Sequence, residues 1–196
     1  MLFLIIGMFM ISLVYAQQAG NPTAGEGIGA KIMAGNYVGE GGQQMMIQQQ
    51  SNNQLQLRVN DVSANCGLNL TQKQVQNQTK LETKLSNGRN AEVKVMPDIA
   101  SKTALQRLRL NVCSEENECQ IELKEVGKGE NSRAAYEVQV KKQAKFLGMF
   151  RTRMLVRAEI GAEDGEIIRT RKPWWAFLAT EEDELEEGEV EEETEE

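Results

Sequence analysis

Histidine is absent from the 196 residues, and this absence limits the chemistry that the chain can perform. Histidine is the usual general base near neutral pH and the commonest metal ligand, so His-based catalytic triads and most zinc, iron or copper sites are excluded. No spacing of carboxylates, calcium ligands or phosphate-binding glycines points to another catalytic centre. The sequence therefore predicts a protein that is not an enzyme and that binds no cofactor or metal.

Aromatic residues are scarce at 5%, and only 3 prolines are present, whereas hydrophobic residues make up 40% of the chain. A chain of this length and composition can bury a core, and it is long enough for one medium domain or two small ones. We therefore expect a folded protein whose core contains few aromatic rings.

Basic residues are missing from residues 181–196, which hold 12 of the 29 acidic residues. The rest of the chain carries 22 basic and 17 acidic residues, so its net charge is +5. The formal net charge of -7 thus reflects an acidic tail, which we predict over residues 180–196. Such a run is typically a disordered, solubilising segment, and the alternative is that it neutralises a basic face of the same chain. Neither part indicates nucleic-acid binding.

The first sixteen residues, MLFLIIGMFMISLVYA, are almost entirely apolar. Their length and the small Ala16 before Gln17 predict a signal peptide over residues 1–16, with an uncleaved N-terminal anchor as the alternative. Both alternatives place the rest of the chain outside the cytoplasm, either secreted or at the cell surface.

Three cysteines are consistent with this location. Cys113 and Cys119 flank the short segment SEENE, and this spacing lets the chain fold back and form a disulfide in an oxidising compartment. Cys66 is then left over, either as a buried small apolar side chain or as an intermolecular thiol. Asn69 and Asn77 each begin an Asn-x-Thr sequence, which makes them possible glycosylation sites.

The first half of the chain predicts a linker followed by hairpins. Residues 17–42 are rich in glycine and read as a linker that joins the fold only at its end. Residues 43–96 show strand-like alternation, with one hairpin around SNN and a second around Ser86, Asn87 and Gly88. We therefore predict a region of β-hairpins over residues 43–96.

In the second half, Pro97 precedes apolar residues at helical spacing, with Asp98 or Ser101 as the expected N-cap and an end near Cys113. Four strand-like segments follow, QIELKEV, RAAYEVQVKKQAKFL, MFRTRMLVRAEI and EIIRTR. The expected fold class is α+β, in which an antiparallel β-meander is covered by one amphipathic helix and preceded by β-hairpins.

The order of these elements carries a resemblance. A helix, a strand ending at Val126 and Gly127, AYEV at 135–138 and VRAEIGAEDGEII at 156–168 resemble the PepSY domain family over residues 98–171, so we assign a PepSY-like unit to 97–179. The strings SNGR, MPD and KPWWAFLA also resemble uncharacterised exported proteins of small-genome archaea, which have no known activity.

The PepSY resemblance implies an extracytoplasmic binding module without catalytic residues, which in some members inhibits a protease. The chain is too short to contain that protease, so the expected function is an exported protein-binding module that modulates or inhibits a separate extracytoplasmic protease. The alternative is a structural or cell-surface protein that self-assembles through strand edges or Cys66.

Two groups of side chains are candidates for contact. Trp174, Trp175 and Phe177 either fold back to close the core or form an exposed contact with a partner or a membrane surface. A basic set lies on neighbouring strands, where it is expected to form a solvated sheet face. Its members are Lys141, Lys142, Lys145, Arg151, Arg153, Arg157, Arg169, Arg171 and Lys172.

Overall fold

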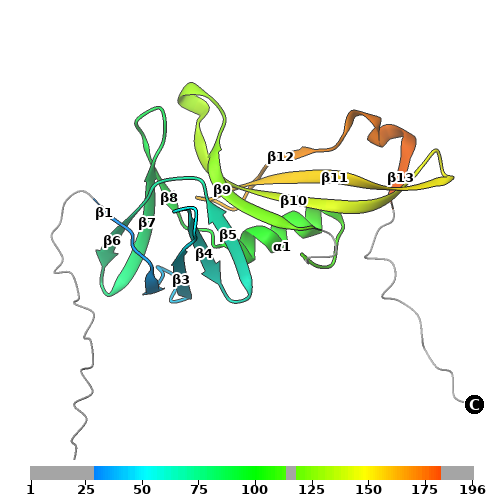
Figure 1. The fold of residues 1–196 in the computed structure, drawn as a ribbon. Coiled ribbons are helices and arrows are strands. Elements are labelled where there is room, and N and C mark those ends of the chain that lie inside the picture. Colours follow the sequence, from blue (N-terminus) through cyan, green and yellow to red (C-terminus); the bar gives the residue numbers. More distant parts are fainter. Residues whose placement is uncertain (1–28, 114–117, 182–196) are drawn as a thin grey trace, which may run out of the picture.

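The computed structural model describes residues 29–113 and 118–181, which form a mostly-β structure of the α+β class with one α-helix, as expected (Figure 1). The helix is α1 (Pro97–Leu108), and two short 3-10 helices are η1 (Gly129–Asn131) and η2 (Trp174–Leu178). The strands are β1 (Ala30–Lys31), β2 (Gly35–Val38), β3 (Gln44–Gln49), β4 (Leu55–Val59), β5 (Val62–Cys66), β6 (Leu70–Val75), β7 (Gln78–Lys84), β8 (Asn90–Val93), β9 (Gln120–Val126), β10 (Arg133–Phe146), β11 (Phe150–Gly161), β12 (Ile167–Arg171) and β13 (Ala179–Glu181).

The strands form two sheets. The larger has nine strands in the order β12-β11-β10-β9-β5-β4-β3-β2, with β13 paired to β10, and the smaller has the order β1-β6-β7-β8. The named strand pairs are antiparallel except for β5 and β9, which are parallel. The β3–β4 hairpin and the late meander therefore belong to one continuous sheet, whereas β7 and β8 belong to the smaller sheet. The sequence alone predicted the strands of the meander but not this junction.

The two predicted hairpins are confirmed as β3–β4 and β7–β8. In the second, Gly88 has a φ of 84°, a backbone conformation that glycine adopts without steric cost, and its N–H donates to the carbonyl of Leu85 at 2.9 Å. Strands β5 and β6 had not been assigned separately.

The predicted linker ends earlier than residue 42. Within its described part, β1 pairs with β6, β2 pairs with β3, and the side chain of Ile32 is buried in the core. Ordering this Gly-rich segment costs conformational entropy, and the burial of Ile32 and the two strand pairings offset that cost.

The ends of α1 differ from the prediction. Met96 is the N-cap and makes no side-chain cap hydrogen bond, because its side chain has no oxygen to accept one, and Pro97 follows at the start of the helix, where its lack of an N–H costs nothing. The helix ends at Leu108, five residues before Cys113, since Arg109 adopts a left-handed φ of 54° and closes the last turn. Val112, expected on the helix, lies beyond it and is exposed.

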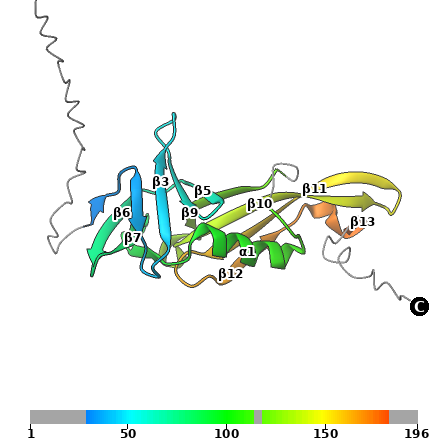
Figure 2. The same ribbon diagram turned by 90° about the horizontal axis from the view of Figure 1, so that it is seen from below.

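The core lies between α1 and the sheets. Ala100, Ala104 and Leu108 of α1 are buried in the same cluster as a row of residues on one face of β10 and β11. That row consists of Tyr136, Val138, Val140, Met154 and Val156, which are all buried. Seen from below, α1 lies across the middle of the sheet and does not reach the far end of the β10–β11 hairpin (Figure 2).

Candidate interaction surface

The long β10–β11 hairpin extends beyond the helix and ends in a tight turn. The strands stay paired up to Phe146 and Phe150, and Leu147 and Gly148 both have positive φ values in the turn. The chain returns to this turn through η2, since the N–H of Leu147 donates to the carbonyl of Leu178 at 2.8 Å. Strand β13 then pairs with the end of β10.

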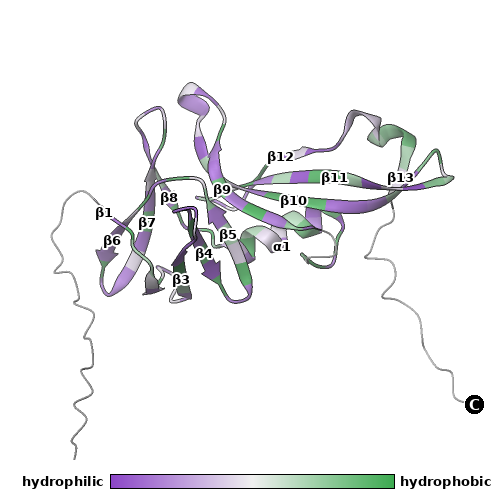
Figure 3. Ribbon diagram, viewed as in Figure 1, coloured by the Kyte–Doolittle hydropathy of each residue, from purple (hydrophilic) through white to green (hydrophobic). Residues whose placement is uncertain are grey.

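Large apolar side chains gather at this end, which carries green segments in both η2 and the hairpin turn (Figure 3). We call this set the apolar tip. It consists of Leu147 (52% exposed), Met149 (73%), Phe150 (63%), Trp174 (82%), Phe177 (76%) and Leu178 (37%).

Of the two alternatives for the C-terminal aromatic rings, closure of the core is wrong for Trp174 and Phe177, which are among the most exposed apolar residues. Trp175 alone turns inward, where its ring meets Phe146 edge-on with centroids 6.1 Å apart and packs against the core cluster. A 3-10 helix has three residues per turn, so Trp174 and Phe177 lie on one side of η2 and Trp175 on another. Because Trp175 faces the core, Trp174 and Phe177 face away from it.

The basic set is confirmed as a sheet face, with one correction. Register pairs Lys145 with Arg151 and Arg157 with Arg171, so their side chains lie on the side opposite to α1. We call this the basic face. It consists of Lys141, Lys145, Arg151, Arg153, Arg157, Arg169 and Arg171.

Lys142 is the correction, because it alternates to the helix side and is only 1% exposed. Its Nζ donates to the carbonyl oxygen of Leu108 at 3.2 Å. An ammonium group at the C-terminal end of α1 is favourable, since the helix carbonyls there bear partial negative charge. Lys142 therefore secures the helix end. Lys172, the last member of the predicted set, follows β12 and is exposed.

Several cations of the basic face have acidic partners. Arg171 bonds the buried carboxylate of Glu159 at 2.8 Å, and Glu118 accepts from Lys141 at 2.6 Å. Arg157 donates instead to the neutral side chain of Gln139 at 2.8 Å. Such mixed pairing is typical of a solvent-exposed sheet face that keeps a net positive charge.

The predicted disulfide is present, and the third cysteine is buried. Cys113 and Cys119 form a disulfide with Cα atoms 5.1 Å apart, which closes the corner between α1 and β9. Cys66 is free and buried, and desolvation raises the pKa of its thiol to about 12. A thiol that stays protonated and buried is a poor candidate for an intermolecular disulfide.

The predicted glycosylation sites both lie on the surface. Asn69 precedes β6 and Asn77 sits in the turn between β6 and β7, and both side chains are exposed. Their modification stays a prediction.

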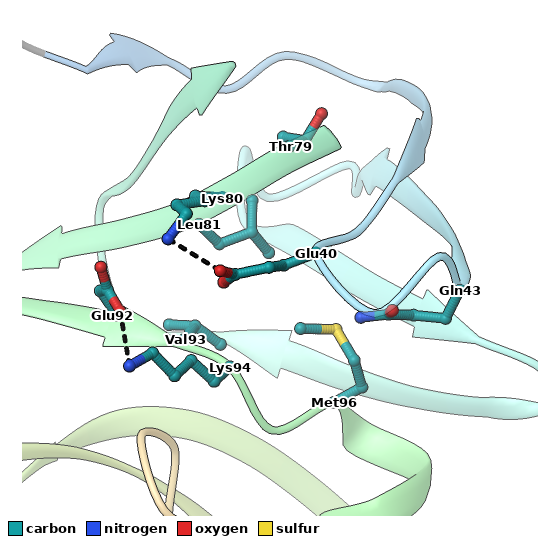
Figure 4. Close-up of a pocket in the computed structure, with 9 residues that line it drawn as sticks. All are labelled: Glu40, Gln43, Thr79, Lys80, Leu81, Glu92, Val93, Lys94 and Met96. Carbon is teal, nitrogen blue, oxygen red and sulfur yellow. Dashed lines mark ion pairs between the residues drawn. The ribbon is translucent and has the colours of Figure 1, made fainter. Parts of the chain in front are cut away.

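A small polar cavity lies between the β2–β3 turn and strands β7 and β8 (Figure 4). Lys80 bonds Glu40 and Lys94 bonds Glu92, each at 2.8 Å. These contacts raise the pKa of both lysines, and Lys94 lowers the pKa of Glu92. The cavity holds about 10 Å³, room for about one water molecule. The Lys80–Glu40 ion pair at this cavity links the smaller sheet to the β2–β3 turn of the larger sheet. The cavity itself is too small for a substrate.

Among residues 29–113 and 118–181, no three Cys, Asp or Glu side chains are grouped to hold a metal ion. In the same part of the chain, no helix has the length and apolar character needed to cross a membrane. Comparison with protein-family models, with curated proteins and with solved structures found no match for the chain. The arguments for function therefore rest on the surface itself, where the apolar tip is the most distinctive feature.

Proposed function

We propose that this chain is an exported, non-enzymatic protein-binding module that captures a partner protein with its apolar tip. The observation that carries the proposal is the distribution of aromatic rings. Within the described residues, the three phenylalanines Phe146, Phe150 and Phe177 and both tryptophans belong to the far end of the hairpin and η2. Across the part of the chain that the structure describes, the aliphatic core contains one fully buried aromatic ring, Tyr136.

This distribution favours a contact role over a packing role. Trp and Phe dominate the binding energy of protein interfaces, where they are enriched relative to the rest of the surface. A folded protein that exposes such rings together keeps an aggregation-prone patch, which is typical of a surface that is covered by a partner. The β10–Trp175 contact holds the patch on a rigid hairpin and thereby lowers the entropy that binding would cost.

Two features support an extracytoplasmic compartment, the apolar residues 1–16 and the disulfide, a bond that persists outside the cytoplasm. The lack of histidine supports a role without catalysis. The PepSY resemblance suggests an extracytoplasmic protease as the partner, modulated or inhibited on binding.

The test is quantitative capture from the extracytoplasmic fraction with immobilised full-length protein. The tip variant Trp174→Ser/Phe177→Ser is compared with the parent and with Met33→Ser/Val38→Ser, which removes exposed apolar residues near β2. We expect the same protein to be enriched by the parent and the control but lost from the tip variant. Equal recovery by all three would contradict the proposal.

A second arm separates protein from membrane contact. Flotation with neutral and anionic lipid vesicles should leave the parent unbound. Vesicle binding that disappears in the tip variant would replace the protein partner with a membrane surface.

Self-assembly is the second candidate, and one observation favours it. Strand β2 forms the outer edge of the nine-stranded sheet, and its Val38 is exposed. Unpaired strand edges pair readily with other chains. Light scattering over a range of concentrations tests this function, which predicts growing species that persist in reductant because Cys66 is buried. A constant monomer mass would contradict it.

A further inference from the structure

We propose that the acidic segment of residues 182–196 docks on the basic face of its own chain. The basic face is an open sheet surface, because α1 packs on the opposite side of the hairpin and Arg151, Arg153 and Arg169 remain exposed. A sheet surface this rich in cations favours a polyanionic occupant.

The basic face retains positive charge after its own ion pairs are formed. Arg151 and Arg169 have no ion pair with any described residue, and Arg157 is bonded to a neutral amide. Arg151 lies directly opposite Lys145 in the register, so these two cations are neighbours on the basic face. A polyanion bound across the strands could contact the side chains of both strands.

The acidic segment of the chain begins at the edge of the basic face. Strand β13 ends at Glu181, which is paired with Ala144 of β10, one residue from Lys145. The fifteen residues that follow include 11 carboxylates and no basic residue. At about 3.3 Å per residue, this segment reaches about 50 Å, which is enough to follow the hairpin along its length.

Tethering makes this docking intramolecular. The short connection to β13 keeps the acidic segment at a high effective concentration near the basic face, so weak ion pairs suffice to hold it there. The docked segment then competes with any external polyanion for the basic face, while the apolar tip stays available. The inference therefore does not depend on the proposed function of the tip.

The experiment is zero-length carbodiimide cross-linking of the full chain, which joins lysine amines to carboxylates that touch them. Products are mapped by mass spectrometry, and only links to residues 189–196 are counted, because residues next to β13 lie near Lys145 in any case. At low salt we expect these links on Lys141 and Lys145 to exceed those on the exposed lysines Lys73 and Lys84 by about fivefold. At 1 M salt the excess should vanish, since screening then acts within about 3 Å.

Two matched variants identify the cause. Arg151→Gln/Arg153→Gln/Arg169→Gln neutralises the basic face, whereas Arg58→Gln/Lys102→Gln/Arg107→Gln removes the same charge elsewhere. The first should lower the links by about fivefold and the second should leave them unchanged, with circular dichroism verifying the fold of both. Equal yields from the two variants would overturn the inference. So would links found only between isotopically heavy and light copies in a mixture, because the segment would then dock on a second chain.

Discussion

The near half of the β10–β11 hairpin and its far end both carry large apolar residues but have different surroundings. In the near half, Tyr136, Val138 and Val140 are buried beneath α1. In the far half, Phe150 and its neighbours in the turn and η2 are exposed. The cause is length. The helix has 12 residues and spans about 18 Å, whereas the 14 residues of β10 span about 46 Å.

This difference shows that alternation determines which face of a strand is apolar but not whether that face is covered. Whether the apolar face is buried depends on the element that packs on it, which here is α1, and α1 ends near Leu108 and Lys142. Beyond that point Trp175 and its neighbours in η2 and β13 pack against the hairpin. Large apolar side chains beyond this cover stay exposed.

Two methionines on this hairpin give the sharpest test of the comparison. Met154 is fully buried, so Met154→Ala should lower the free energy of unfolding by about 2–5 kcal/mol. Met149 lies exposed in the turn, so Met149→Ala should change it by less than about 0.5 kcal/mol. Urea denaturation measures both, and similar losses in the two variants would show that the far half is covered as well.

The disulfide between Cys113 and Cys119 secures the corner where the cover ends. Closing so short a loop restricts the unfolded chain by about 2 kcal/mol, so Cys113→Ser/Cys119→Ser should lose about this amount of stability. Thermal unfolding of the parent in reductant is the control and should show the same loss. An unchanged midpoint in both would refute a stabilising role.

The neighbouring tryptophans compare a half-buried and an exposed environment within η2. Trp175→Ala should cost about 1–3 kcal/mol, less than a fully buried ring, because Trp175 is half-buried against Phe146. Trp174→Ala should cost less than about 0.5 kcal/mol. Chemical denaturation distinguishes them, and a larger loss from Trp174 would reverse their assignment.

The smallest expected effect lies at the near end, where the β7–β8 turn contacts β9. Ser86 donates to Glu125 from its hydroxyl at 2.5 Å and from its N–H at 2.9 Å, and these bonds lower the pKa of Glu125. A lowered pKa contributes stability at neutral pH that is lost as the pH falls through the folded-state pKa. Ser86→Ala should therefore raise the pKa of Glu125 toward its ordinary value, as NMR titration would detect. No change would mean that the hydroxyl contact does not form in solution.

Much of the fold could be predicted from the sequence because its signals are local. Alternation identified the strands of the meander, and Asn87 with Gly88 identified a hairpin turn. The parallel pairing of β5 with β9 could not be predicted, because it joins segments more than fifty residues apart that have no local signature. The end of α1 was misplaced because Val112 continues the helical spacing after Arg109 has already ended the helix.

The candidate surface could be predicted only in part. The sequence identified the aromatic cluster and the basic strands, since both are compositional. It could not show that Trp174 faces outward while Trp175 faces inward, because that depends on how the 3-10 turn meets the hairpin. Lys142 was assigned to the wrong face for a related reason, since a polar residue was not expected at an inward position.

The most direct test of the central claim places a photo-reactive benzoylphenylalanine at Phe177 of the full chain, with Val75 of β6 as the matched exposed control position. Irradiation in the extracytoplasmic fraction should yield one dominant protein adduct from position 177 and none from position 75. Equal adducts from both positions, or an adduct from position 75 alone, would contradict the claim that the apolar tip is the contact surface.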